Sequence, residues 1–156
     1  MSDKSYLDWP FFEEGHRQLQ AELERWIAGN VTAHHGDTDG ACRDLVARLG
    51  KAGWLRYAVG GKDCGGQHDT IDTRAICLLR ETLARHDGLT DFAFAMQGLG
   101  SGALTLHGSP GQKQRYLTKV AAGEAIAAFA LSEPGSGSDV AAMECTARAD
   151  GDAYLL

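Results

Sequence analysis

The amino-acid sequence predicts a mainly α-helical fold that passes into the first strands of an incomplete β-domain. Apolar residues recur at helical spacing through most of the chain. The period then changes, because Ala125–Leu131 is a short apolar run and Met143–Ala149 alternates apolar with polar side chains. We therefore expect a helical domain over residues 1–124 and the truncated start of a β-domain over residues 125–156.

The first two predicted helices are amphipathic. One apolar face belongs to the first helix and comprises Phe12, Leu19, Leu23, Trp26 and Ile27. The second repeats apolar residues at i, i+3, i+4 and i+7, which are Cys42, Leu45, Val46 and Leu49. Gly53 is suited to the residue just beyond this helix. Glycines then cluster over 54–69, so we expect a long connection with a short extended piece at 55–59.

A third helix is predicted over Thr70–His86. Asp69 is a candidate cap, and Asp72 suits the positive N-terminal end. The residues expected to point inward are Ile71, Ala75, Ile76, Leu79 and Leu83.

The fourth predicted helix covers Thr90–His107. Its core face should comprise Phe92, Met96, Leu99, Ala103 and Leu106. Gly98, Gly100 and Ala103 match a loose dinucleotide-binding pattern, but no strand precedes them, as such a site requires. Gly98 and Gly102 are better interpreted as a place where a neighbouring helix approaches closely.

The fifth predicted helix has the clearest boundaries. Ser109 is the expected cap, Pro110 takes the first helical position, and Gln112 can complete a capping box. The helix should end near Ala122, where Gly123 can supply the left-handed residue.

A β-hairpin is predicted at the C-terminus. Asp150 and Gly151 form the expected turn, and Ala153–Leu156 starts the return strand. Two or three strands with open edges cannot bury both faces. We therefore expect the chain to be the N-terminal part of a longer protein.

Composition excludes several classes of function. The 156 residues are 44% hydrophobic and 23% charged, with a net charge of −6, as in a soluble globular protein that does not favour nucleic acid or an anionic membrane. Neither a membrane span nor a signal peptide is predicted. Four cysteines lack metal or redox spacing, and we expect Cys42 and Cys77 to be buried and reduced in a cytoplasmic protein.

One histidine-rich stretch suggests a metal site at first sight. His34 and His35 precede Asp37 and Asp39, but adjacent residues of a helix do not share a face. A solvated helix end and loop explains this stretch better, and no metal site is predicted.

The stretch Phe129–Asp139 reads Phe-Ala-Leu-Ser-Glu-Pro-Gly-Ser-Gly-Ser-Asp. Pro134 fixes its own φ, while Gly135 and Gly137 permit positive φ and close backbone approach. Successive N–H groups in such a turn can point toward an anion. Hydroxyl groups come from Ser132, Ser136 and Ser138. From the residues alone, a polar-cofactor loop and an ordinary turn between strands both remain open.

The order of these residues resembles the flavin-binding signature of acyl-CoA dehydrogenases. That signature has a Leu or Val, a Thr or Ser, Glu-Pro, a Gly-rich turn and Gly-Ser-Asp, and Ser132 stands where Thr is commoner. The resemblance extends upstream through Glu81–Arg85 and Gly108–Glu124, and downstream to Thr146–Tyr154. It is specific from about Gly108 onward.

The resemblance implies an FAD-dependent enzyme that oxidises acyl-CoA to trans-2-enoyl-CoA, by α-proton abstraction and β-hydride transfer to flavin. The implied FAD contacts are Phe129, Ala130, Leu131 and Ser132 along the ring edge, with Gly137 and Ser138 at the pyrophosphate. Ser138 is also the implied contact of the acyl-CoA arm. Part of the fourth helix would line the acyl pocket.

In this resemblance no catalytic residue lies in the chain. Glu133 is a turn residue, and the proton-abstracting base is expected in a C-terminal domain. The implied partners are acyl-CoA, an electron-transfer flavoprotein or another acceptor, and further copies of the protein in a homo-oligomer. We expect these 156 residues alone neither to turn over acyl-CoA nor to hold FAD tightly.

Three alternatives remain at this point. An acyl-CoA oxidase or a dehydrogenase-like flavin monooxygenase would carry the same N-terminal pattern. A non-catalytic helical interaction module would keep the framework without the chemistry. A nonfunctional gene remnant would yield no stable protein.

Overall fold

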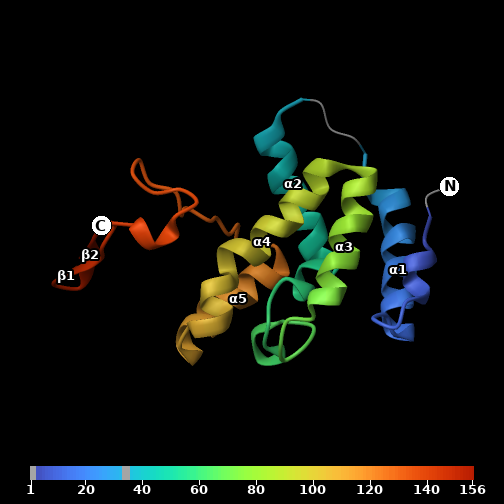
Figure 1. Cartoon of the computed structure of the whole chain (residues 1–156), viewed down its shortest axis with the longest axis horizontal. Helices are drawn as coiled ribbons and strands as arrows, with labels where there is room; N and C mark the ends of the chain where they lie inside the picture. The colour runs from blue at the N-terminus through green and yellow to red at the C-terminus, as the bar shows by residue number, and fades with distance from the viewer. Residues whose placement is uncertain (1–2, 33–35) are drawn as a thin grey trace.

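A computed structural model of the chain describes residues 3–32 and 36–156. It confirms a mainly α-helical fold that ends in a short two-stranded sheet (Figure 1). The helices are α1 (Glu14–Asn30), α2 (Thr38–Lys51), α3 (Thr73–His86), α4 (Gly88–His107) and α5 (Pro110–Ala122), and the strands are β1 (Arg148–Asp150) and β2 (Ala153–Leu155). Short 3-10 turns occupy Ser5–Asp8, Trp54–Tyr57, Lys62–Cys64 and Val140–Ala142.

The helices pack around α3 and α4. Helix α3 lies between α1 and α4, and α4 in turn contacts α2 and α5 (Figure 1). Leucines and one phenylalanine fill the main core, and its fully buried side chains include Leu23, Leu45, Leu49, Leu55, Leu79, Leu83 and Phe94. A smaller cluster joins α5 to the 54–69 connection through Val59, Cys64, Leu117, Val120 and Ala121.

Several helix boundaries agree with the sequence signals. The Ser109 hydroxyl accepts from the Gln112 N–H, and the Gln112 side chain accepts from the Ser109 N–H, which confirms the capping box. Gly123 follows α5 at φ 74°, left-handed as predicted, and Gly53 lies just beyond α2, where the stop was predicted, at φ 84°. Helix α4 starts slightly earlier than predicted because Asp87 accepts from the Thr90 N–H at 2.9 Å.

The predicted start of α3 was wrong. Asp72, and not Asp69, is the cap: its carboxylate accepts from the backbone N–H groups of Arg74 at 2.9 Å and Ala75 at 3.3 Å. The same carboxylate contacts the Nε2 of the buried His16 at 3.1 Å, so the cap also ties α3 to the start of α1. This contact between distant segments is what selects one aspartate over the other.

Replacing Asp72 with alanine should lower the free energy of unfolding by about 1–2 kcal/mol at neutral pH. Burial opposes ionisation, but hydrogen bonds from His16, Ala75 and Arg74 outweigh it and hold the pKa of Asp72 below its ordinary value of 3.8. Because the folded pKa is the lower one, the stabilisation is complete above the ordinary pKa of 3.8 and is lost as the pH falls through the folded pKa. Urea unfolding should show the gap between variant and wild type closing as the pH falls below 3.8.

The control for this prediction is Asp69→Ala. The Asp69 side chain is 78% exposed and its ion pair with Lys62 is long, at 3.7 Å. We expect a change within about 0.5 kcal/mol. Equal losses for the two variants would mean that α3 is not capped as described.

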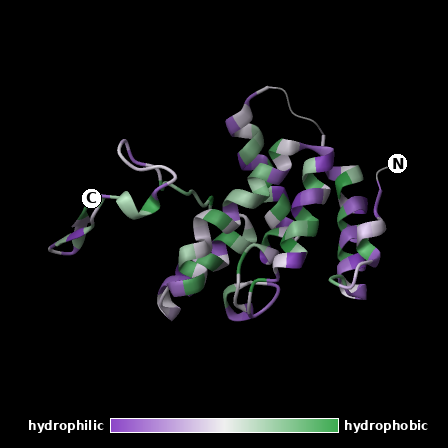
Figure 2. Cartoon of the chain, viewed as in Figure 1, coloured by the Kyte–Doolittle hydropathy of each residue, from purple (hydrophilic) through white to green (hydrophobic). Residues whose placement is uncertain are grey.

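The predicted core face of α4 was also wrong. Phe92, Leu99 and Leu106 are 55%, 51% and 70% exposed. The buried residues of this helix are Thr90, Ala93, Phe94, Gln97 and Ser101. Figure 2 shows that α4 carries apolar or weakly polar residues around most of its circumference, so hydropathy alone does not choose a face. The face that packs inward combines Ala93 and Phe94 with the polar Thr90, Gln97 and Ser101, so the choice of face depends on contacts with other segments.

Two predictions about the middle of the chain need correction. A 3-10 turn at Trp54–Tyr57 replaces the extended piece expected at 55–59, because Trp54 and Leu55 turn into the core and Trp54 packs edge-on against Trp26. Cys77 is exposed and Cys42 is half-buried, while Cys64 is the buried cysteine. Helix α3 buries Leu78 and Leu79 beside Cys77, which turns the thiol outward.

Helices α2 and α5 touch backbone to backbone. A Cβ on Gly50 would overlap the carbonyl of Ala122 and the Cα of Gly123. A Cβ on Gly123 would come within 2.6 Å of the Val46 carbonyl oxygen. Glycine is therefore required at this crossing for space as well as for the left-handed turn.

The C-terminal residues differ most from prediction. The run 125–131 is not a strand, because the described residues offer it no partner strand. The predicted strand at 143–149 shortens to β1, whose residues are exposed and not half-buried. The predicted hairpin is confirmed, but its turn lies one residue later: Asp150 ends β1 opposite Ala153, and Gly151, at φ 63°, and Asp152 form the turn.

Candidate functional site

One buried amide fixes the path of the chain after α5. Gln97 of α4 is 1% exposed; its side-chain oxygen accepts from the Ala127 N–H at 2.9 Å, and its Nε2 donates to the Ala93 carbonyl at 3.2 Å. The hydrogen bond holds Ala127 against α4, and the extended segment 125–131, which contains no helix or turn, leads from there away from the helices (Figure 1). Sequence analysis missed Gln97, because nothing local in the pattern indicates its distant partner.

Gly100 provides the space for that segment. A Cβ at this position would lie 2.6 Å from the backbone nitrogen of Ala128 and 2.7 Å from its carbonyl oxygen. The predicted close contact at Gly98 and Gly102 is therefore misplaced. Gly98 faces Ala58 at an ordinary 3.5 Å, and Gly102 has nothing within 4 Å.

Gln97→Leu should lower the free energy of unfolding by about 1–3 kcal/mol, because the Ala127 N–H and the Ala93 carbonyl both lose a partner. Amide hydrogen exchange should report the loss directly, as faster exchange at Ala127. Gln114→Leu on the exposed side of α5 is the matched control, expected within about 0.5 kcal/mol. Unchanged exchange at Ala127 would contradict the anchoring role of Gln97.

The extended segment leads into a turn that is braced from within. Glu133 and Ser136 exchange two backbone hydrogen bonds, of 2.8 and 3.1 Å. Ser136 is 4% exposed and donates from Oγ to the Asp139 carbonyl at 2.8 Å. Of the three predicted hydroxyls, that of Ser136 is therefore part of the turn itself. Those of Ser132 and Ser138 lie on exposed residues.

The residues predicted for the flavin ring edge present free backbone donors. Within 3–32 and 36–156, no hydrogen bond engages the N–H groups of Phe129, Ala130, Leu131 or Ser132. The Phe129 side chain is 47% exposed. An extended backbone with unpaired N–H groups and a hydroxyl matches the polar edge of an isoalloxazine ring, so these residues fit FAD chemically.

The predicted phosphate-contacting residues follow on the same loop. Gly137 and Ser138 are exposed, and neither Gly135 nor Gly137 adopts positive φ, in contrast to the predicted use of these glycines. A Cβ at either glycine would meet nothing within 4 Å. The glycines therefore leave open space beside the backbone, which lets an anion approach its N–H groups.

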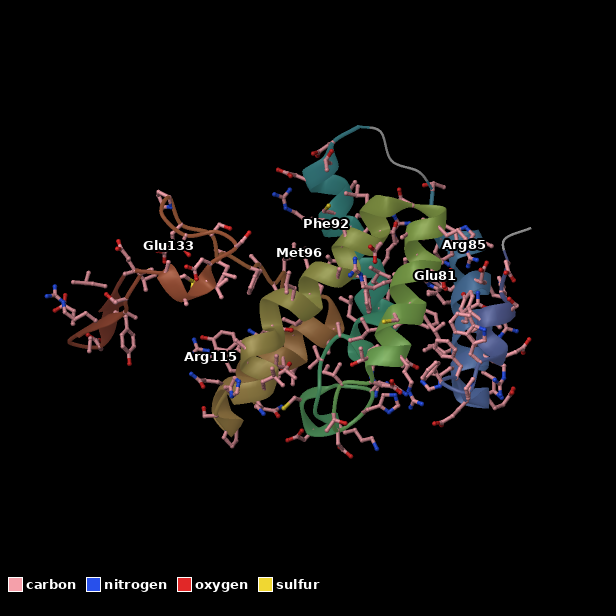
Figure 3. All side chains as sticks on the ribbon, in the orientation of Figure 1. Glu81, Arg85, Phe92, Met96, Arg115 and Glu133 are labelled. Atoms are coloured by element: carbon pink, nitrogen blue, oxygen red, sulfur yellow. The ribbon has the colours of Figure 1, made fainter. Side chains whose placement is uncertain are left out.

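Two apolar cavities border α4, and the smaller of them touches the start of this segment. A groove of about 550 Å³ between α3 and α4 is lined by residues that include Ile76, Phe92, Met96, Leu99 and Leu106. A smaller hollow of about 230 Å³ is bounded by Met96, Phe92 and the backbone segment at Ile126. Figure 3 shows Phe92 and Met96 on the same stretch of α4, with Glu133 on the C-terminal segment beyond.

The helical part of the chain matches a known protein family. The family described as acyl-CoA dehydrogenase, N-terminal domain, matches residues 13–124, which span all five helices and more than half of the 156 residues. The chain belongs to the acyl-CoA dehydrogenase family. The resemblance stated from the sequence is thus confirmed.

Relatives of this acyl-CoA dehydrogenase domain cover nearly the whole chain. A probable acyl-CoA dehydrogenase of Mycobacterium leprae is 34% identical over 146 residues, which are 92% of this chain and 37% of that protein. A 3-(aryl)acrylate reductase of Clostridium sporogenes is 34% identical over 151 residues, which are 94% of this chain and 39% of that protein.

One solved structure has a fold similar to that of this acyl-CoA dehydrogenase domain. The acyl-CoA dehydrogenase of Bacillus anthracis, crystallised in complex with FAD, aligns with a TM-score of 0.74 at 27% identity over 99% of this chain. The alignment covers 29% of the Bacillus chain. The chain therefore spans well under half the length of these relatives.

Two further properties bear on this acyl-CoA dehydrogenase domain. Across the part of the chain that the structure describes, no helix is long and apolar enough to cross a membrane. In the same residues no group of three or more His, Cys, Asp and Glu side chains is placed to hold a metal ion. The stretch at His34 and His35, interpreted as a solvated loop, lies outside the described residues.

Proposed function

We propose that this chain forms the helical side and the flavin-facing segment of an enzyme that oxidises acyl-CoA to trans-2-enoyl-CoA. The observation that carries the proposal is the extended segment from Phe129 to Ser132, whose N–H groups are unpaired and whose path Gln97 fixes. The loop with Gly137 and Ser138 follows it directly. We take residues 1–124 as the helical domain and 125–156 as the start of a β-domain.

Each part of the proposed site has one task. The backbone of Phe129, Ala130 and Leu131, with the Ser132 hydroxyl, would hold the ring edge of FAD. Gly137 and Ser138 would bind its pyrophosphate, and Ser138 would also contact the acyl-CoA arm. FAD, when bound, supplies the acceptor for the hydride that leaves the β-carbon.

The apolar groove on α4 would take the acyl chain. Phe92 and Met96 border both cavities and present apolar surface beside the extended segment. Excluding water there strengthens the electrostatic interactions that act on the thioester. We assign the proton-abstracting base to no residue of this chain, because the Glu133 carboxylate accepts from two backbone N–H groups, those of Glu144 at 2.8 Å and Cys145 at 3.0 Å.

The family suggests an electron acceptor, an assembly and a location for the proposed enzyme. We propose an electron-transfer flavoprotein or another acceptor as the oxidant of the reduced flavin, a homo-oligomeric assembly, and a cytoplasmic location. Rapid reoxidation of the reduced flavin by oxygen would instead favour an oxidase or monooxygenase.

FAD titration of the purified chain tests the proposal. We expect weak binding, detected as a change of flavin fluorescence at up to about 1 mM FAD, which corresponds to about 4 kcal/mol. No turnover of acyl-CoA by this chain alone is expected, since it supplies no base. A titration with no change at any concentration would reject the flavin-binding role.

A second candidate reaction is suggested by one relative. The Clostridium protein is named as a reductase of 3-(aryl)acrylates and matches 94% of this chain. The same hydride transfer run in reverse would reduce a conjugated double bond, and the exposed Phe92 beside the groove offers an aromatic contact for an aryl group. Saturation-transfer NMR can compare how strongly aryl-substituted and alkyl acyl-CoA ligands receive saturation from the protein. Stronger transfer to the aryl ligands would favour the reductase, and stronger transfer to the alkyl ligands would favour the acyl-CoA dehydrogenase.

A further inference from the structure

The Glu133 carboxylate closes the loop that follows the extended segment. Its Oε2 accepts from the Glu144 N–H at 2.8 Å, and its Oε1 accepts from the Cys145 N–H at 3.0 Å. Both oxygens are thus used, on two successive backbone donors. Hydrogen bonds of this kind to an ionised carboxylate are roughly twice as strong as those between neutral groups.

The loop between these residues has almost no other support. From Pro134 to Leu156 every residue is exposed except Ser136. Inside the loop there are the Glu133–Ser136 backbone pair, the Ser136 hydroxyl bond to Asp139, and the backbone bonds of the short 3-10 turn Val140–Ala142, at 3.2 and 3.4 Å. Because the loop buries so little apolar surface, its order depends on hydrogen bonds, and the Glu133 pair is what joins its two ends.

The position of this closure matters for the proposed ligand. Gly137 and Ser138 lie between the two ends that Glu133 joins, and Ser132 precedes it directly. Figure 3 shows Glu133 on the C-terminal segment, away from the packed helices. A loop that is already closed loses less conformational entropy when it binds a ligand than one that must order first.

We propose that Glu133 is a positioning residue: its carboxylate holds loop 133–145 preformed, so that Ser132, Gly137 and Ser138 meet the FAD pyrophosphate and ring edge together. The effect on FAD rests on the proposed function, whereas the closure itself does not. In this role Glu133 contacts neither substrate nor cofactor. The loop that it positions makes the contacts with FAD.

The test compares Glu133→Gln with Glu144→Gln. A glutamine at 133 keeps one acceptor oxygen and turns an NH₂ group toward the other backbone donor. The control removes the same charge from the same loop, and among the described residues no hydrogen bond or ion pair involves the Glu144 carboxylate. Three quantities are measured for each: amide exchange at Glu144 and Cys145 without flavin, FAD affinity, and the melting temperature of the helices.

We expect Glu133→Gln to speed exchange at both amides and to weaken FAD binding about tenfold, the equivalent of losing one charge-assisted hydrogen bond. The melting temperature should stay at the wild-type value, because the loop lies outside the helical core. Glu144→Gln should change none of the three. A general loss of structure would instead lower the melting temperature.

Other outcomes separate the two proposals. Unchanged exchange in Glu133→Gln, or faster exchange with wild-type FAD affinity, overturns the positioning role. If the wild-type chain binds no FAD, the proposed function fails. Amide exchange alone then tests whether the loop is preformed. Amides of Glu144 and Cys145 that are protected in the wild type and exposed by Glu133→Gln support the preformed loop, whereas unprotected wild-type amides overturn it.

Discussion

Truncating Phe94 to alanine should lower the free energy of unfolding by about 3–5 kcal/mol. Phe94 is 1% exposed and belongs to the core that joins α1, α2, α3 and α4. Removing its ring leaves a cavity that neighbouring leucines cannot fill without moving their helices. Small domains are stable by about 5–15 kcal/mol, so denaturant unfolding followed by helical circular dichroism should show a large fall in midpoint.

Phe92→Ala is the matched control on the same helix. Its ring is 55% exposed, so we expect a change within about 0.5 kcal/mol. The pair therefore tests which face of α4 packs inward. A larger loss from Phe92 than from Phe94 would restore the face predicted from the sequence and reject the packing described above.

Gly100→Ala should displace the segment that leads to the proposed flavin loop. The new Cβ would lie 2.6 Å from the Ala128 nitrogen, which is backbone and cannot move aside as a flexible side chain would. We expect an overpacking cost of about 1–3 kcal/mol, set against a helix-propensity gain of at most about 1 kcal/mol. Loss of the Gln97–Ala127 hydrogen bond should follow, seen as faster exchange at Ala127.

The same displacement should weaken FAD binding by about tenfold or more, since Phe129 to Ser132 would leave their path. Gly102→Ala makes the same chemical change where nothing lies within 4 Å. That control should raise the melting temperature and leave FAD affinity unchanged. Identical behaviour of the two variants would show that Gly100 makes no close contact with the segment.

Local signals in the sequence predicted local structure well. The Ser109 capping box, the left-handed Gly123 and the turn at Gly151 each depend on residues within a few positions, and each was confirmed. The start of α3 failed, because Asp69 and Asp72 are equally good caps in isolation. The contact from Asp72 to His16, which no local pattern encodes, decides between them.

Packing explains the remaining errors. The large apolar side chains of Phe92 and Leu99 suggested the wrong face of α4, because the face that packs inward includes the polar Thr90, Gln97 and Ser101. The run 125–131 has the composition of a strand, but a strand also needs a hydrogen-bonded neighbouring strand. Here the Ala127 N–H donates to the Gln97 side chain and not to another strand. The order of residues from Leu131 to Asp139 indicated the acyl-CoA dehydrogenase family, which is confirmed, while the flavin contacts of this loop stay a prediction. The bracing by Glu133 and Ser136 depends on contacts that the order of residues does not show.

The contact between Gly50 and Gly123 has a consequence for the order of folding. Helix α5 carries its own start and stop signals, so it can form early from local interactions. Its docking on α2 joins segments far apart in sequence, and closing such a long loop is entropically slow. A side chain at Gly50 would therefore leave both helices intact but undocked. It would raise the rate of unfolding more than it lowers the rate at which the helices first form.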